Sequence, residues 1–526
     1  MKRSNLNIWI ILTILLVGMG SISFAQTIIY VDANAAGGNN GTTWADAYVY
    51  LQEALADANS AEKPVEIRVA QGTYKPNEGL LAIPEFDWKT TTFQLINEVT
   101  IKGGYAGIGE PDPNTRDATL YQTVLSGDLN GDDTLNIWLF ELDNSYHVIT
   151  GSGTDPNAVL DGFTITGGNS MQGGGMYNDA GSPTITNCTF SGNDAHLGGG
   201  MYNINGSNPT LIMCTFSENT VSFNELSGSG GGMYNQNSNP TLINCTFSKN
   251  VASWQGVGGA MTNSESNPTL INCTFVANSV EGNDDTLTSG GGAIFNDQSS
   301  PTLFNCIFSA NSALAGTGGG INNVGSNLML VNCTFAANRA SVGSALAFQQ
   351  SEQKEKGEPS LAYITNSILW DDGNQIRNDD GSIITITYTD IQGGQSAIHD
   401  PLMTVFWGDG NIDSDPYFAS PGYWATWDDL SVVAEPNDSS AVWVDGDYHL
   451  KSEAGRWDPQ GGVWVQDGIT SPCIDAADPI SPFALEPLPN GDRINMGAYG
   501  GTAEASKSPL TASPEEPKEE PKEEKP

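Results

Sequence analysis

Few side chains in the repetitive middle of this sequence could carry out acid–base chemistry. Between Phe163 and Phe348 the only cationic side chains are Lys249 and Arg339, and the same stretch holds nine acidic residues. Abstracting a proton next to a substrate carboxylate needs a basic side chain and positive charge that neutralises the carboxylate. An anionic polymer would instead meet a net-negative surface here, so we interpret both cations as solvated loop charges.

Hydrolysis by a general acid and a general base needs two carboxylates on one surface. Candidate pairs are adjacent in the sequence: Asp284-Asp285, Asp371-Asp372 and Asp379-Asp380. Neighbouring residues of a strand point to opposite faces, so adjacency alone does not make a catalytic pair. The four histidines are scattered along the chain: His147, His196, His399 and His449. No catalytic triad, phosphate-binding loop or zinc spacing is found, and we assign no catalytic residue.

The segment GDLNGDDTLN resembles the beginning of a calcium-binding loop. Asp128, Asn130 and Asp132 stand at alternate positions, as the first oxygen ligands of such a loop do. The sixth position, usually glycine, is Asp133, and Leu139 stands where the loop has its glutamate. The segment therefore predicts either a Ca²⁺ site or an acidic turn, and the acidic turn is the interpretation that we favour. No other cofactor is expected.

Tryptophan is concentrated near the end of the chain. Seven of the twelve tryptophans lie between positions 370 and 464, in an irregular, Asp-rich stretch. Exposed aromatic rings can stack on sugars or anchor a protein partner. Trp407, Trp424 and Trp427 are therefore candidate carbohydrate-binding residues. The alternative, which we favour, is that the tryptophans fold a compact C-terminal cap over the end of the repeats.

A repeated unit must position all of these residues. Each unit begins with an apolar residue after a triplet of small residues, at Met176, Met201, Met233, Met261, Ile294, Ile321 and Leu346. The distance from that residue to a closing asparagine is 17 residues in five units and 18 in one, whereas the following joint varies from 8 to 16. A unit of fixed length with one variable joint is typical of a solenoid. The shortest turn, of 25 residues, suits three short strands, which predicts an all-β parallel β-helix of about ten to twelve coils.

Stacked coils place each residue on its own copy, which predicts ladders of identical side chains. In PTLINCTF the alternation puts Ile243, Cys245 and Phe247 on one face, which we expect to point inward. The expected cysteine ladder comprises Cys188, Cys214, Cys245, Cys273, Cys306 and Cys333. The closing asparagines are expected to stack at a turn with left-handed geometry: Asn193, Asn219, Asn250, Asn278, Asn311 and Asn338. In-register cysteines lie about one coil apart, too far for disulfides, so we expect buried thiols.

These motifs carry a family resemblance. Phe-x-x-Asn, together with Gly-Gly-Ala-Met (258–261) and Gly-Gly-Ala-Ile (291–294), resembles the repeat of chlamydial polymorphic outer membrane proteins. The segments YVDANAAGGNNGTTWADAYVYLQEAL, SPCIDAADP and INMGAYGG resemble the start and end of exported β-helix proteins of the pectin lyase-like superfamily. The resemblance implies a right-handed helix and export. It leaves activity open, because the fold carries both polysaccharide-cleaving enzymes and adhesins. The Gly-His-Gly signature of polygalacturonases is absent.

The flanks complete the predicted organisation. Lys2 and Arg3 before an apolar run predict a signal peptide over residues 1–25. Trp44, Tyr48, Leu51 and Leu55 would share one face of a helix that caps the first coil. We expect the cap and early coils over 26–160, regular repeats over 161–395, a Trp/Asp-rich cap over 396–506 and a disordered Pro/Glu-rich tail over 507–526.

The net charge of the chain limits the classes of partner that we expect. The chain has 61 acidic and 20 basic residues, a formal charge of −41, which disfavours nucleic acid. We predict an exported, extracellular or outer-membrane-associated, monomeric protein without a membrane span in its mature chain. Its expected role is adhesin-like and non-catalytic, with loops that bind a polysaccharide or a cell-surface protein. The alternative is a pectate lyase-like or polygalacturonase-like enzyme.

Overall fold

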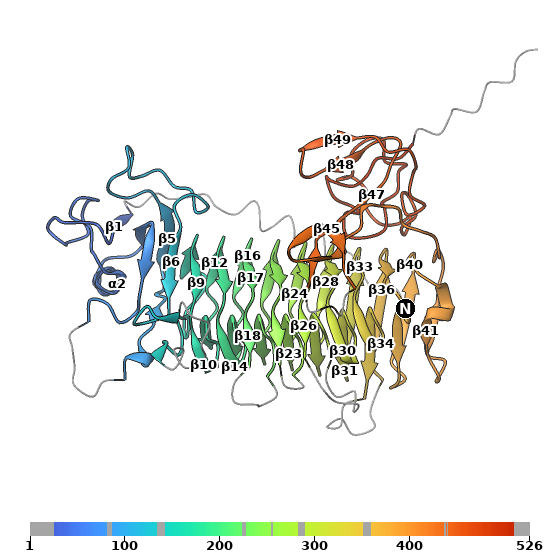
Figure 1. The fold of residues 1–526 in the computed structure, drawn as a ribbon, viewed down its shortest axis with the longest axis horizontal. Helices are drawn as coiled ribbons and strands as arrows, with labels where there is room; N and C mark the ends of the chain where they lie inside the picture. The colour runs from blue at the N-terminus through green and yellow to red at the C-terminus, as the bar shows by residue number, and fades with distance from the viewer. Residues whose placement is uncertain are drawn as a thin grey trace, which may run out of the picture.

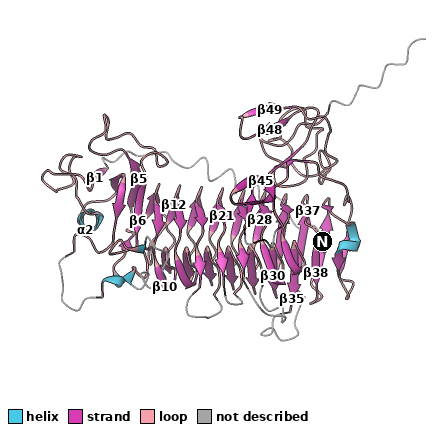
Figure 2. Ribbon diagram, viewed as in Figure 1, coloured by secondary structure: helices cyan, strands magenta, loops and turns pink. Residues whose placement is uncertain are grey.

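The computed structural model describes residues 26–80, 87–133, 143–222, 228–253, 256–281, 290–350, 359–435, 438 and 440–509. These residues form a long rod of stacked parallel strands with a smaller unit on its flank (Figure 1). Strands dominate the rod and helices are few (Figure 2). None of the helices in the described ranges has the length and apolar character needed to cross a bilayer.

Four parallel sheets run along the rod. Sheet A has 13 strands, from β1 (Thr27–Val31) to β42 (Val405–Trp407), and sheet B has 11, from β3 (Gly72–Tyr74) to β40 (Asp390–Ile391). Sheet C has 11 strands, from β4 (Phe93–Gln94) to β41 (Ile398–His399), and sheet D has 7, from β10 (Asn169–Gln172) to β34 (Arg339–Val342). The predicted parallel β-helix and its number of coils are confirmed.

One central coil shows how the chain visits the four sheets. It runs through β19 (Met233–Gln236) in sheet C, β20 (Thr241–Ile243) in sheet A, β21 (Thr246–Ser248) in sheet B and β22 (Val251–Ala252) in sheet D. The three predicted strands are therefore joined by a short fourth one. The next coil pairs in register, with Phe247 opposite Phe275.

The inward face differs from the expected one at one position. Leu242, Cys245 and Phe247 are buried, whereas Ile243 is half-exposed. Asn244 has φ of 54° and makes a left-handed turn between β20 and β21. The turn resets the alternation, because Leu242 belongs to one strand and Cys245 precedes the next. The expectation that Ile243 points inward was wrong.

Phenylalanine rings stack along the axis of the rod. From Phe190 to Phe335, consecutive ring centroids lie 4.5–5.0 Å apart with interplanar angles of 3–8°. The six cysteines of the repeats, from Cys188 to Cys333, are buried beside them and are free. Burial raises the pKa of the Cys188 thiol to about 12, which keeps it in the neutral form.

The closing asparagines form a buried amide ladder. Each Nδ2 from Asn193 to Asn311 donates to Oδ1 of the next asparagine at 2.8–3.0 Å. The left-handed residue is the one before each asparagine, such as Lys249, with φ of 54°. The asparagine side chain can therefore turn inward, where its amide satisfies the backbone of the neighbouring coil.

A second amide ladder was not predicted from the sequence. Asn178, Asn203, Asn235, Asn263, Asn296 and Asn323 are buried and bonded side chain to side chain at 2.8–2.9 Å. They stand two residues after the apolar residue that begins each unit. This constant offset in the sequence could have identified the second ladder.

The glycine triplets allow neighbouring coils to approach closely. Gly230 has φ of 68°, and a Cβ on Gly231 would lie 2.5 Å from the carbonyl oxygen of Gly259. Only glycine fits between these two backbones.

The first coil is covered by the helix α2 (Leu51–Ser60), which buries Leu51 and Leu55 against the core. The predicted helix was too long. Tyr48 instead exchanges backbone hydrogen bonds with Tyr30 and Asp32, and Trp44 packs on the ring of Tyr30. Pairing to the first strand of sheet A thus delays the start of the helix.

The C-terminal unit lies on the side of the rod (Figure 1). Asn305 Nδ2 donates to the carbonyl oxygen of Ala498 at 2.8 Å, and Asn332 Nδ2 donates to that of Gly500 at 2.9 Å. Ile368 of sheet B shares a buried core with Phe418. The expectation that this unit caps the last coil was wrong, because it folds back over earlier coils.

Candidate functional site

A row of hydroxyl groups covers the open part of sheet B. Phe190 points inward from β13 (Thr189–Ser191), so Thr189 and Ser191 point outward. The strand register stacks the outward threonines as one column: Thr164, Thr189, Thr215, Thr246 and Thr274. We call this column, with Ser191, Ser217 and Ser248, the hydroxyl face. Its side chains are half-exposed.

Beyond Thr274 the C-terminal unit covers the same column. Ile307 and Ile368 pack into the core of that unit, and Thr334 Oγ1 accepts a hydrogen bond from the Ala498 amide at 2.9 Å. The hydroxyl face therefore ends where the C-terminal unit begins. Three small antiparallel sheets, two of two strands and one of three, form the unit.

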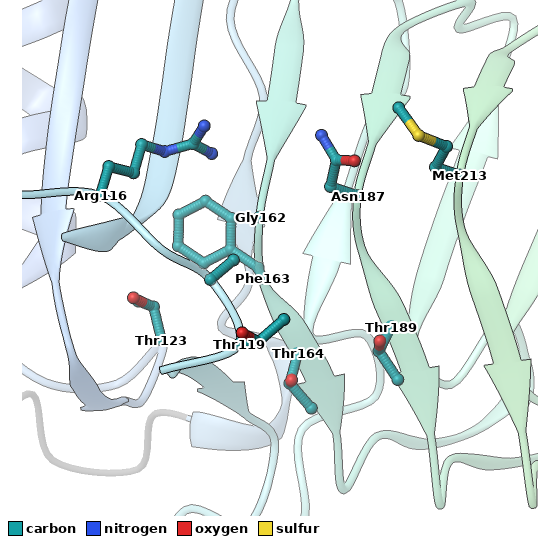
Figure 3. Close-up of a pocket in the computed structure, with 10 residues that line it drawn as sticks. Arg116, Thr119, Thr123, Gly162, Phe163, Thr164, Asn187, Thr189 and Met213 are labelled. Atoms are coloured by element: carbon teal, nitrogen blue, oxygen red, sulfur yellow. The ribbon is translucent and has the colours of Figure 1, made fainter. Parts of the chain in front are cut away.

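A hollow of about 400 Å³, lined by polar side chains and also by Phe163 and Met213, lies at the other end of the hydroxyl face (Figure 3). Thr164 and Thr189 line it together with Arg116 and Asn187. Arg116 Nε donates to the carbonyl oxygen of Gly103 at 2.8 Å, and its Nη2 lies 2.9 Å from Asp161 Oδ2.

Asp161 also anchors the amide of the hollow. Asn187 Nδ2 donates to Asp161 Oδ1 at 2.8 Å, so one carboxylate holds both Arg116 and Asn187. The carboxylate of Asp161 balances the charge of the Arg116 guanidinium, so this ion pair adds no net charge to the hollow. The other polar groups of the hollow are hydroxyls and an amide. Such a lining suits a neutral, hydroxyl-rich ligand.

The predicted cations do not converge. Lys249 lies in the turn after β21, with its Nζ 3.9 Å from Glu218 Oε1 and its side chain 61% exposed. Arg339 begins β34 in sheet D, three coils further along the asparagine ladder. Three coils correspond to about 14 Å.

The predicted carboxylate pairs also separate. Asp371 is buried, whereas Asp372 is exposed. Asp379 forms an ion pair with Arg377 at 2.6 Å, and Asp380 accepts a hydrogen bond from the Ser382 amide at 2.8 Å. Asp284 and Asp285 lie outside the described residues. Within the described ranges, none of these pairs places two unengaged carboxylates on one surface.

The tryptophan candidates belong to two parts of the molecule. Trp424, in β44 (Tyr423–Thr426), packs edge-to-face on Trp443 with centroids 5.4 Å apart, and Trp427 is 70% exposed. Trp407 lies in β42, opposite Ile386, and packs against the end of the main core. The structure therefore separates Trp407 from the other two.

Two of the three predicted metal ligands, Asp128 and Asp132, lie close together, and Asp133 joins them in place of Asn130. Carboxylate oxygens of Asp128, Asp132 and Asp133 all lie within 4.8 Å of one another. Asn130 is engaged in the turn itself, since its Nδ2 donates to Asp132 Oδ2 at 3.0 Å. Within the loops at the variable joints, which we expected to bind partners, residues 223–227, 254–255 and 282–289 lie outside the described residues.

The hydroxyl face was not predicted from the sequence, although Thr-Phe-Ser recurs at the same place in three units. The hollow could not be predicted for a different reason. Arg116 and Asn187 meet only through Asp161, across three segments of the chain.

Comparisons with known proteins bear on the fold. Residues 148–340 match the family model described as a right handed beta helix region, and residues 431–477 match the one described as disaggregatase related. A search among curated proteins finds no match.

Among solved structures, the chain is similar to the pectate lyase Pel9A, with 14% identity, a TM-score of 0.46, and 90% of this chain and 96% of that one covered. It is also similar to the tailspike protein gp49 of the Acinetobacter baumannii bacteriophage Fri1, a capsular polysaccharide depolymerase, with 13% identity, a TM-score of 0.40 and coverage of 74% and 63%. A rhamnogalacturonan lyase has 12% identity, a TM-score of 0.31 and coverage of 75% and 91%.

These similarities are too low to bear on activity. The polymorphic outer membrane protein repeat stays a prediction. The matched family model and the stacked parallel sheets agree on the architecture: the chain is built around a right-handed parallel β-helix.

Proposed function

We propose that the protein is an exported, non-catalytic, adhesin-like β-helix that binds a neutral polysaccharide along the hydroxyl face. The observation that carries the proposal is the in-register column from Thr164 to Thr274, which runs from the hollow to the C-terminal unit. The column repeats once per coil, and a linear polymer also presents its hydroxyl groups at a regular repeat. Several weak hydrogen bonds in register can add up to useful affinity.

Charge favours a neutral ligand over an anionic one. The formal charge is −41, and Arg116 is held by Asp161 instead of being free to bind a substrate carboxylate. A polyuronate would be repelled by the protein as a whole.

The non-catalytic part of the proposal rests on the placement of candidate acids and bases. Arg116 is the cation nearest to the hydroxyl face at the hollow, but its guanidinium is engaged by Asp161 and by the Gly103 carbonyl. Lys249 follows Ser248 at the edge of the hydroxyl face, with its Nζ 3.9 Å from Glu218 Oε1. Arg339 lies three coils further along the asparagine ladder. Cleavage by a lyase or hydrolase is the competing activity, and the experiment below separates it from binding.

The test removes hydroxyl groups without changing side-chain shape. A triple variant with Thr189→Val, Thr215→Val and Thr246→Val keeps β-branched residues in the strands. Retention of neutral polysaccharides is measured by affinity electrophoresis, together with new reducing or unsaturated ends. We expect a loss of affinity of about tenfold or more, with no cleavage by the wild-type protein.

Sheet A, which is visited before sheet B in each coil, provides the matched control. Thr210, Thr241 and Thr269 form an equivalent outward column there. Their replacement by valine should leave retention unchanged. Equal retention by both triple variants would contradict binding along the hydroxyl face, and product formation by the wild type would establish the enzymatic alternative.

A further inference from the structure

Three carboxylates meet in the loop that follows β6 (Thr123–Ser126). Asp128, Asp132 and Asp133 have carboxylate oxygens within 4.8 Å of one another. Asp128 Oδ1 orders the loop by accepting hydrogen bonds from the Gly131 amide at 2.6 Å and from the Asp132 amide at 3.3 Å. Lys75 Nζ lies near Gly131, yet within the described residues it forms no ion pair with these carboxylates at 4.0 Å or less.

A fourth side chain joins this cluster from later in the same connection between β6 and β7 (Ile149–Thr150). Asn144 is 3% exposed, and its Nδ2 donates to Asp133 Oδ2 at 2.8 Å. Its Oδ1 is buried and has no hydrogen-bond partner, and the same is true of Asp132 Oδ1 and Asp133 Oδ1. Buried acceptors without a donor are costly, so three of them at one place indicate a missing positive ligand.

We propose that Asp128, Asp132, Asp133 and Asn144 bind one Ca²⁺ ion. The donors are all oxygen atoms, which suits a hard cation, and Ca²⁺ accepts six to eight oxygen ligands in a flexible arrangement, with water completing the shell. Mg²⁺ demands a stricter octahedral geometry, and zinc would call for histidine or cysteine. Asn130, an expected ligand, is excluded because its amide is used within the loop.

The local electrostatics agree with this assignment. The carboxylates of Asp128, Asp132 and Asp133 carry like charge within 4.8 Å of one another, so they repel each other. A divalent cation would relieve this repulsion. It would also bridge Asp133 to Asn144, which lies on the segment that leads into β7.

The test is calorimetric titration of CaCl₂ into the chelator-treated full chain. We expect one ion per chain and weaker binding of MgCl₂. Asp132→Asn and Asp133→Asn should each weaken Ca²⁺ binding by about tenfold or more. Ca²⁺ should raise the melting temperature of the wild type and have little effect on that of the variants.

The control is Asp117→Asn. Asp117 is another acidic turn residue, and its Oδ1 accepts hydrogen bonds from Thr119 and Leu120. This variant should bind Ca²⁺ like the wild type. If a loop variant does not fold, Asn144→Ala replaces it as the test.

Folded wild-type protein that binds no Ca²⁺ at concentrations on the order of 10 mM would overturn the proposal. Undiminished binding by both Asp133→Asn and Asn144→Ala would overturn it too. Neither measurement involves a polysaccharide, so the result does not depend on the proposed function.

Discussion

Asp371 occupies a position that asparagine occupies in the six preceding coils. Asn338 Nδ2 donates to Asp371 Oδ1 at 3.0 Å, which continues the amide ladder, but Asp371 Oδ2 is buried without a partner. Burial raises the pKa of Asp371 to about 8. The carboxyl group therefore keeps its proton in the folded protein at neutral pH, whereas an unfolded aspartate loses it near pH 4.

This difference makes stability depend on pH. Between about pH 4 and pH 8 the folded state binds one more proton at Asp371 than the unfolded state, so the free energy of unfolding falls as pH rises through that window. Asp371→Asn should reduce the slope and stabilise the protein at pH 8 by about 1–3 kcal/mol, because the asparagine amide can donate where the carboxylate cannot. Urea unfolding from pH 5 to pH 9 measures both effects. The exposed Asp372→Asn serves as the control, and an Asp371→Asn variant that is destabilised at every pH would contradict this account.

Trp424 and Trp427 are neighbours with different roles. Trp424 packs on Trp443, whereas Trp427 is 70% exposed. Trp424→Ala should destabilise the C-terminal unit by about 1–3 kcal/mol through lost packing. Trp427→Ala should leave stability unchanged and weaken polysaccharide retention, because its ring is free to stack on a sugar. Thermal unfolding and affinity electrophoresis distinguish the two, and retention unaffected by Trp427→Ala would exclude this ring from the binding surface.

The amide ladders stabilise the rod at the scale of the element. In the central coil, Asn250 Oδ1 accepts from both the backbone amide and Nδ2 of Asn219, and its own Nδ2 donates to the Phe216 carbonyl oxygen at 2.9 Å. Asn250→Ala leaves these buried groups without partners, and we expect a loss of roughly 3 kcal/mol in the free energy of unfolding. Urea unfolding measures this loss.

An exposed asparagine of the same coil offers the comparison. Asn239 Oδ1 accepts one hydrogen bond, from the Asn267 amide, at the surface. Asn239→Ala should cost less than about 1 kcal/mol, because water replaces the lost partner. Similar losses for both variants would mean that burial of the ladder contributes little.

At the scale of the whole molecule, the hydroxyl face is an open surface of sheet B with a defined start and end. The hydroxyl face begins at the hollow and ends at the C-terminal unit, and the net charge of the chain is strongly negative. If the ligand is neutral, affinity should change less than about twofold between 50 and 500 mM NaCl, since screening affects only charge–charge interactions. Affinity electrophoresis at several salt concentrations tests this. A steep loss of affinity with added salt would show that the ligand is charged.

The repeat in the sequence was enough to predict the solenoid, its coil number and the composition of its main ladders. Each coil has another coil as its neighbour, so Phe247 must meet Phe275 once the register is set. Local turns were harder to predict. The left-handed Asn244 moves Leu242 inward in place of Ile243, and no simple alternation of apolar residues reveals such a break.

Only the tertiary structure decided which surface stays open and which oxygens meet. The C-terminal unit covers the later strands of sheet B through contacts such as that between Asn305 and Ala498, which are 193 positions apart. Asn144 meets Asp133 from 11 positions further along the chain, and Arg116 reaches Asn187 only through Asp161. The sequence by itself determined the stacked core, because there identical side chains of successive coils pack on one another. It did not determine these sites, because they join unlike segments through contacts that no repeat encodes.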